Sequence, residues 1–179
     1  MEVILYHGSS RKINRFHGFT SSKKKNRMQY GSGLYTTTSY NWASLYGRCM
    51  NTLKVELDEN KSSRNVMVSI ADCATFVYEN CSKKFYEFFM KEFASTKETC
   101  TAYQFQYFFL VYRMDKFHLM AQAMNDWLVA QGVQYTPDHE LKGDLVLIHD
   151  FKMIREMVQA KDYGYQDSPR LDEKYFKKY

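Results

Sequence analysis

Residues 30–47 read YGSGLYTTTSYNWASLYG, and this stretch carries the clearest structural signals in the chain. Two glycines flank a serine near its start, so the backbone can turn sharply there or approach a ligand where a Cβ would obstruct it. Residues 34–38 combine threonines with a tyrosine and predict a strand. Ser39 or Asn41 is suited to cap a helix that follows. The stretch therefore predicts a glycine turn, a strand and a short helix, in that order.

Two tyrosines of this stretch lie eleven positions apart, Tyr35 on the predicted strand and Tyr46 on the predicted helix. A strand that leads into a capped helix can present both rings to one cleft. Upstream, residues 3–6 form a short apolar run that predicts a buried first strand, followed by a polar loop that begins at His7. One histidine and two tyrosines are therefore the first candidates for a binding site.

The sequence GSGLYTTTSYNWASLYG resembles the second motif of the ADP-ribosyltransferase superfamily, in its poly-ADP-ribose-polymerase-like or diphtheria-toxin-like branch. In that family a glycine-rich turn leads into a strand tyrosine, and a second tyrosine follows eleven residues later on a helix. The family's first motif is a strand that ends in Tyr-His-Gly-Ser or Tyr-His-Gly-Thr, and residues 5–9, LYHGS, are similar to it. The resemblance covers about the first 58 residues and a C-terminal strand.

The resemblance implies roles in NAD binding for residues of both motifs. His7 would bind a ribose hydroxyl of the adenosine half, and the backbone of Gly8 would hold the nicotinamide carboxamide. Tyr35 and Tyr46 would sandwich the nicotinamide ring. Stacking a cationic ring between two electron-rich faces is physically reasonable, at roughly 0.5 to 2 kcal/mol for each contact.

Three further residues complete the NAD-binding set that the resemblance implies. Ser9 follows the first-motif glycine, and Gly33 belongs to the glycine turn. Relatives often carry a serine eight residues after the strand tyrosine, where it bonds the carboxamide. This chain has Ala43 there, and the adjacent Ser44 is the expected substitute.

The family also has a glutamate at the start of a late strand, where it hydrogen-bonds the 2′-hydroxyl of the nicotinamide ribose. In this sequence Asp144 directly precedes the apolar run at 145–148, and Glu140 lies four residues earlier. Aspartate is one methylene shorter than glutamate, so its reach is less by about one carbon–carbon bond. We favour Asp144 as the catalytic carboxylate, and Glu140 reaching in from its loop is the alternative. Asp144 as a plain turn residue after Gly143 is the structural interpretation that competes with both.

The rest of the chain predicts one domain with a core of its own, since 179 residues are enough for that. Aromatic residues make up 17% of the chain and recur at helical offsets between residues 71 and 130. They predict three or four amphipathic helices with breaks near 81–82, 95–99 and 115, and their rings are expected to form the core. Further strands are predicted at 52–57, 133–135 and 145–148, a short strand or the approach to a helix at 66–70, and a strand end followed by a helical turn at 151–158.

We therefore expect an α+β fold. Residues 1–159 would form a single ADP-ribosyltransferase-like domain, in which a split sheet forms the core and an aromatic-rich helical block is inserted at about 71–131. Residues 160–179 would form a C-terminal extension, either loosely packed or a segment that binds a partner.

The net charge of +5 favours anionic partners, and lysines and arginines gather at residues 11–27, between the two motifs. Such a cluster is usually a solvated surface, but here it would also attract a pyrophosphate or a nucleic acid. The four cysteines show no paired spacing and indicate free thiols in a reducing compartment. The five histidines show no metal-ligand spacing, so we predict no metal site.

Several classes of protein are disfavoured by what the sequence lacks. It has no run of about eighteen apolar residues and no signal-peptide pattern, so we expect a cytoplasmic protein without membrane contact. It also has neither a GxSxG nucleophile elbow nor a GxxxxGK[ST] phosphate loop.

The resemblance implies an enzyme, a mono-ADP-ribosyltransferase that uses NAD as its substrate and modifies a macromolecule. Nucleic acid is slightly favoured over protein as the acceptor because of the basic cluster. A toxin-like or phage-conflict effector, with an antitoxin or inhibitor protein as partner, is a natural context. Two alternatives stay open: a catalytically inactive domain that binds NAD or ADP-ribose, and a basic nucleic-acid-binding module that uses exposed aromatic residues.

Overall fold

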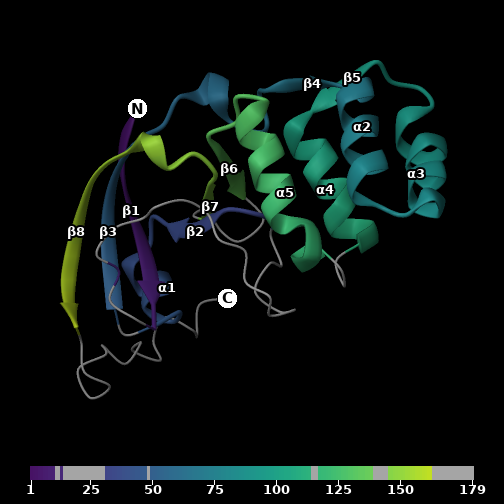
Figure 1. Ribbon diagram of the computed structural model, residues 1–179. Coiled ribbons are helices and arrows are strands. Elements are labelled where there is room, and N and C mark those ends of the chain that lie inside the picture. The colour runs from purple at the N-terminus through teal and green to yellow at the C-terminus, as the bar shows by residue number, and fades with distance from the viewer. Residues whose placement is uncertain (11–12, 14–30, 48, 114–116, 139–144, 163–179) are drawn as a thin grey trace, which may run out of the picture.

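The computed structural model describes residues 1–10, 13, 31–47, 49–113, 117–138 and 145–162 (Figure 1). Two parts lie side by side, an antiparallel sheet of six strands and a block of helices. The fold class predicted from the sequence, α+β, is confirmed.

The sheet opens between two of its neighbouring strands. It contains β1 (Glu2–Ser9), β2 (Leu34–Thr37), β3 (Cys49–Glu56), β6 (Tyr135–Asp138), β7 (Leu145–Ile148) and β8 (Ile154–Asp162), in the order β6-β7-β2-β1-β3-β8. β1 and β3 pair along their whole length, from Glu2 to Ser9. β1 and β2, in contrast, are in register at one pair, Tyr6 opposite Thr37. The strands therefore diverge beyond that pair, and Figure 1 shows β2 running across the direction of β1.

The first strand is longer than predicted. We expected it to end at Tyr6 and a polar loop to follow, but residues 7–9 continue β1. Their partners are residues 49–51 of β3, a strand that begins three residues before its predicted start at Thr52. The prediction was wrong because it followed apolar side chains, whereas strand pairing satisfies the backbone groups of polar residues equally well.

A short helix, α1 (Tyr40–Ser44), follows β2. Its N-cap is Ser39, whose hydroxyl accepts a hydrogen bond from the Trp42 backbone N–H at 3.3 Å, so the choice between the two predicted caps is settled. The helix is shorter than predicted, because Tyr46 lies in the turn after α1 and not on the helix itself.

The helical block follows the predicted breaks. It contains α2 (Ile70–Asn80), α3 (Lys83–Phe89), a π-helical turn (Met90–Ala94), α4 (Ala102–Arg113) and α5 (Phe117–Ala130). The breaks near residues 81–82 and 95–99 are confirmed, and the third falls between α4 and α5, although Asp115 itself lies outside the described residues. A two-stranded sheet of β4 (Met67–Ser69) and β5 (Thr99–Thr101) joins the start of α2 to the start of α4. The second of these strands was not predicted.

Two groups of buried side chains form the interior. The larger lies within the helical block and includes Phe89, Phe105 and Phe109, none of which has any exposed surface. The smaller lies against the six-stranded sheet and includes Leu5 and Ile148. The prediction that the aromatic stripes form the core is therefore confirmed.

The C-terminal strands correct two predictions. We expected a strand at 133–135 that residues 136–138 would stop, but β6 begins only at Tyr135 and runs through Pro137 to Asp138. Because β6 is at the edge of the sheet, one side of the strand does not need the N–H that proline lacks. At 151–158 the order is reversed, since a 3₁₀ turn (Phe151–Met153) comes first and β8 follows. β7 has the extent predicted from its apolar run.

We predict that Phe105→Ala lowers the free energy of unfolding by about 3 to 5 kcal/mol, because the cavity would be surrounded by rings that cannot close it. The Phe105 ring packs against Trp127 and Phe109, with centroid distances of 4.8 and 5.2 Å. Urea denaturation followed by circular dichroism measures the change. Tyr78→Ala is the control, because Tyr78 is 73% exposed on α2 and its loss should have a much smaller effect. Equal losses in the two variants would contradict this account of the core.

Candidate functional site

The two sequence motifs meet where the sheet opens. The His7 ring on β1 lies with its Nδ1 2.8 Å from the backbone carbonyl oxygen of Tyr35 on β2. A carbonyl oxygen can only accept a hydrogen bond, so Nδ1 carries the proton. In the neutral ring Nε2 is then an acceptor.

The protonation state of His7 follows from its surroundings. Burial lowers the pKa of His7 below its usual value, and the hydrogen bond to the Tyr35 carbonyl opposes this effect only in part. At neutral pH the imidazole is therefore uncharged, with its proton on Nδ1. A neutral imidazole of this tautomer can accept a hydrogen bond from a ribose hydroxyl, which is the predicted role of His7.

A buried asparagine supports the same stretch of β1. Asn51 on β3 is 1% exposed and lies opposite His7. Its side-chain nitrogen donates to the His7 carbonyl oxygen at 3.3 Å and to the Ser9 hydroxyl at 3.4 Å. Asn51 was not among the predicted site residues, because the predicted strand began one residue after it. A polar residue at a buried position is the signal that identifies it.

Gly8 allows α1 to lie directly on β1. A methyl group at Gly8 would collide with the carbonyl oxygen of Ala43 and would lie 3.4 Å from the Cβ of Tyr46. The end of α1 and the Tyr46 turn therefore sit over Gly8, and the Tyr46 side chain is 64% exposed. No side chain larger than glycine fits this contact without moving the helix.

The other predicted site residues near α1 have local partners. The Ser44 hydroxyl donates to the Asn41 carbonyl oxygen at 2.7 Å, and the Ser9 hydroxyl donates to the Cys49 carbonyl oxygen at 3.4 Å. The Tyr35 hydroxyl donates to the Gly31 carbonyl oxygen at 2.8 Å, so the side chain of Tyr35 is hydrogen-bonded to the glycine turn that precedes it.

The glycine turn before Tyr35 has the conformation that its sequence predicts. Gly31 and Gly33 have φ angles of 115° and 122°, a region that side chains with a Cβ rarely adopt. Ser32 between them is fully buried. The turn is also crowded: a methyl group at Gly31 would collide with the Gln106 side chain, and one at Gly33 would lie 3.1 Å from His149 Nδ1.

A buried polar network lies against this turn and connects the helical block to the sheet. His149, which follows β7, lies with Nε2 2.8 Å from the Thr136 hydroxyl on β6 and with Nδ1 2.9 Å from Asn125 Oδ1 on α5. The Thr136 hydroxyl also lies 3.2 Å from Gln106 Oε1 on α4. All four side chains are at most 3% exposed. The network was not predicted from the sequence. The signal that could have revealed it is the presence of polar residues, Gln106 and Asn125, on otherwise apolar helix faces.

The proton count of the network limits its arrangement. Burial lowers the pKa of His149 to about 3, so the ring is neutral at physiological pH and carries one proton. The Thr136 hydroxyl also has one proton, so it cannot donate to His149 and to Gln106 together. One of the two carboxamides, on Gln106 or Asn125, must therefore turn its NH2 group, and not its oxygen, towards the network at neutral pH.

The two candidate carboxylates, Asp144 and Glu140, lie outside the described residues, as does most of the basic cluster at 11–27. The strand that follows them in the chain, β7, does lie within the described residues. Leu145, the first residue of β7, pairs with Thr37 of β2, and Leu147 pairs with Tyr35. The strand that follows Asp144 therefore begins beside the strand that carries Tyr35.

Comparison of the chain with protein-family models, with curated proteins and with solved structures finds no match in any of the three. Within the described ranges there is no helix with the length and apolar character to cross a bilayer. Those ranges also contain no group of three or more histidine, cysteine or acidic side chains placed to hold a metal ion. All four cysteines are free thiols.

The low pKa of His149 predicts an acid-sensitive fold. The unfolded chain takes up a proton at this histidine near pH 6.5, whereas the folded chain does so only near pH 3, so folding opposes protonation between these values. The contribution of His149 to stability is fully present above pH 6.5 and is lost as the pH falls towards 3, with a slope of up to about 1.4 kcal/mol per pH unit.

Urea denaturation of the wild type and of His149→Gln between pH 7 and pH 4 tests this prediction. The free energy of unfolding of the variant should depend less steeply on pH, because glutamine does not titrate. Each curve is referred to its own value at pH 7, so that the loss of packing in the variant is removed from the comparison. Parallel curves would show that His149 is not the residue responsible.

Proposed function

We propose that this protein is an NAD-dependent mono-ADP-ribosyltransferase with an ADP-ribosyltransferase-like split sheet, and that it transfers ADP-ribose to a macromolecular acceptor. One observation carries the proposal: the two motifs that resemble this family meet at a single place, where His7 Nδ1 bonds the Tyr35 carbonyl oxygen. The divergence of β1 and β2 beyond Tyr6 and Thr37 supports the split sheet.

The proposed reaction breaks the bond between nicotinamide and ribose. Nicotinamide leaves with the bonding electron pair as a neutral molecule, and the ribose carbon develops oxocarbenium character until a nucleophilic atom of the acceptor bonds to it and loses its proton. A site for this reaction must hold the dinucleotide still and place negative charge near the developing positive charge.

Each residue of the proposed site is assigned a task. His7 accepts a hydrogen bond from a ribose hydroxyl through Nε2, since its Nδ1 proton is committed to the strand. The backbone of Gly8 binds the carboxamide, and the absence of a side chain there lets the Ala43 carbonyl of α1 approach. Tyr35 and Tyr46 stack on the nicotinamide ring.

The carboxylate is the remaining part of the proposal. Asp144 is favoured over Glu140, because it directly precedes a strand that is paired with the strand of Tyr35. Its hydrogen bond to the 2′-hydroxyl would stabilise the positive charge on the ribose.

Release of nicotinamide from labelled NAD, with separate pools of RNA, DNA and protein as acceptors, tests the proposed activity. We expect His7→Ala and Tyr35→Ala to lower the turnover of NAD by about 10²-fold or more, because each removes a contact that positions the reacting groups. Tyr78→Ala is the matched control, a tyrosine on an exposed face of α2, and should leave turnover unchanged. NAD binding by calorimetry without nicotinamide release would instead identify an inactive binding domain.

A second experiment identifies the carboxylate. Asp144→Asn should lower nicotinamide release by roughly 10²- to 10³-fold, as expected when a charge that stabilises the transition state is removed. Glu140→Gln should retain turnover close to the wild type. The reverse result would assign the role to Glu140, and full activity in both variants would refute the assignment of either residue.

A further inference from the structure

An arginine and two tyrosines form a stacked ladder on the side of α4 that faces the edge of the sheet. The guanidinium carbon of Arg64 lies 4.2 Å from the ring centroid of Tyr103. The rings of Tyr103 and Tyr107 are 6.0 Å apart and nearly parallel, with an interplanar angle of 12°. They occupy positions i and i+4 of the helix, which places them on one face. Tyr107, at the outer end of the ladder, is 46% exposed.

The ladder lies close to β2, the strand that carries Tyr35. Arg64 Nε donates a long hydrogen bond of 3.5 Å to the carbonyl oxygen of Pro137 on β6. Pro137 pairs with Val146 of β7, which pairs with Thr36, the residue after Tyr35. Two steps between neighbouring strands correspond to about 10 Å. Gln106, between the two tyrosines in sequence, packs against Gly31 in the turn before Tyr35.

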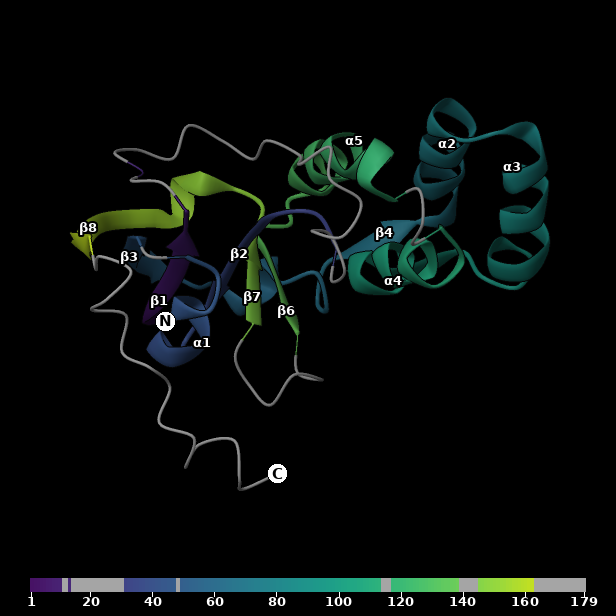
Figure 2. The same ribbon diagram turned by 90° about the horizontal axis from the view of Figure 1, so that it is seen from below.

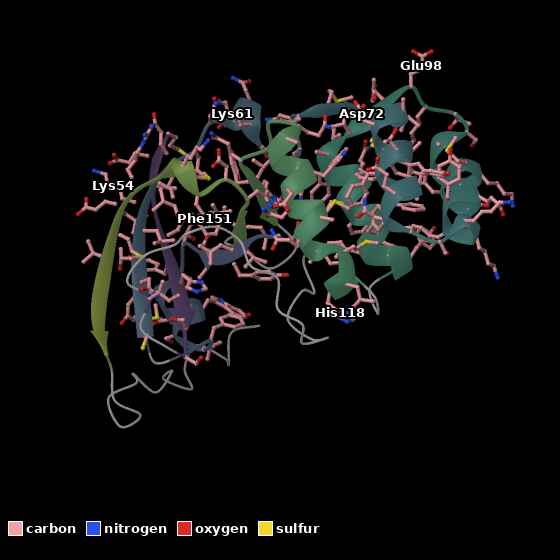
Figure 3. The ribbon with its side chains drawn as sticks, in the orientation of Figure 1. Lys54, Lys61, Asp72, Glu98, His118 and Phe151 are labelled. Atoms are coloured by element: carbon pink, nitrogen blue, oxygen red, sulfur yellow. The ribbon has the colours of Figure 1, made fainter. Side chains whose placement is uncertain are left out.

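The surroundings distinguish the ladder from an ordinary core contact. No carboxylate whose side chain the structure describes pairs with Arg64, and the bond to Pro137 is at the limit of hydrogen-bond length. The core of the block is built by the opposite face of α4, through Phe105 and Phe109. Figure 3 shows Lys61, three residues before Arg64, where the chain passes from the sheet to the helices, whereas Asp72 and Glu98 lie farther along the block. Figure 2 places α4 between β6 and helices α2 and α3.

We propose that this ladder binds an unpaired base of a single-stranded nucleic acid, which is the acceptor of the ADP-ribose. The base stacks on the exposed Tyr107 ring, and the Arg64 charge attracts backbone phosphates of the same strand. The net charge of +5 favours the same ligand. The role as acceptor rests on the proposed transferase function, whereas the binding of the strand does not.

Fluorescence anisotropy with a labelled single-stranded RNA and a single-stranded DNA of about twelve nucleotides, within the usual site size, tests the binding. Tyr107→Ala should weaken binding by about 5- to 100-fold, the range expected for the loss of one stacked base. Tyr107→Phe should bind like the wild type, because stacking needs the ring and not the hydroxyl. Arg64→Ala should weaken binding and flatten its dependence on salt.

Tyr78→Ala is the matched control, because Tyr78 also contacts a second tyrosine, Tyr86, at a centroid distance of 5.6 Å, but edge-on and without a stacked cation. Its affinity should equal that of the wild type. If Tyr107→Ala and Arg64→Ala bind the strand as tightly as the wild type, the proposal is overturned. It is also overturned if the wild type binds neither strand, or if labelled NAD modifies only protein.

Cleavage of NAD by water, measured without an acceptor, separates this proposal from the proposed function. Tyr107→Ala should keep that cleavage and lose transfer to the oligonucleotide, a result that supports both. A wild type that binds the strand through Tyr107 but never releases nicotinamide would support the binding site and refute the transferase. A Tyr107→Ala variant that transfers ADP-ribose to the oligonucleotide as well as the wild type would refute the ladder as the acceptor site.

Discussion

The divergence of β1 from β2 is the constraint on which the arrangement of the site depends. Two neighbouring strands that pair at Tyr6 and Thr37 alone leave backbone groups beyond that point without partners in a ladder. The His7 imidazole satisfies one of them, the Tyr35 carbonyl oxygen, and is oriented by doing so. Asn51 holds the same segment from the other side, through the His7 carbonyl oxygen and the Ser9 hydroxyl. A histidine fixed in this way has a defined tautomer and a defined direction for its second nitrogen.

The helical block also contacts the glycine turn before β2. Gln106 on α4 and Asn125 on α5 reach the glycine turn through Thr136 and His149, so the block determines how closely the turn can approach the sheet. These buried polar contacts favour one arrangement, because a shift of either helix would break them in the interior. The positive φ angle of Gly31 and the contact with Gln106 are therefore two parts of one structural requirement.

The sequence predicted the local elements better than their connections. The glycine turn, the strand after it, the Ser39 cap and the core role of the phenylalanines each depend on neighbouring residues, and each is confirmed. The errors arise where distant segments decide the outcome. β3 extends β1 past Tyr6, the edge position allows Pro137 inside β6, and the backbone of β4 makes residues 99–101 a strand. His149 had no sequence signal of its own, because its partners come from α5 and β6.

The phenylalanines and the tyrosines of α4 have different surroundings. Phenylalanine has no polar atom, so Phe105 and Phe109 can be buried completely, as they are. A tyrosine hydroxyl needs a partner when it is buried, which favours positions with one end in water. Tyr103 and Tyr107 lie on the face towards β6, four residues apart, with an arginine stacked on the first ring. One helix thus has an apolar face that holds the block together and an amphipathic face beside the strands of the site. The separation follows from the hydroxyl group, and together with Arg64 it is the physical basis for proposing a ligand with both a flat ring and a negative charge at the second face.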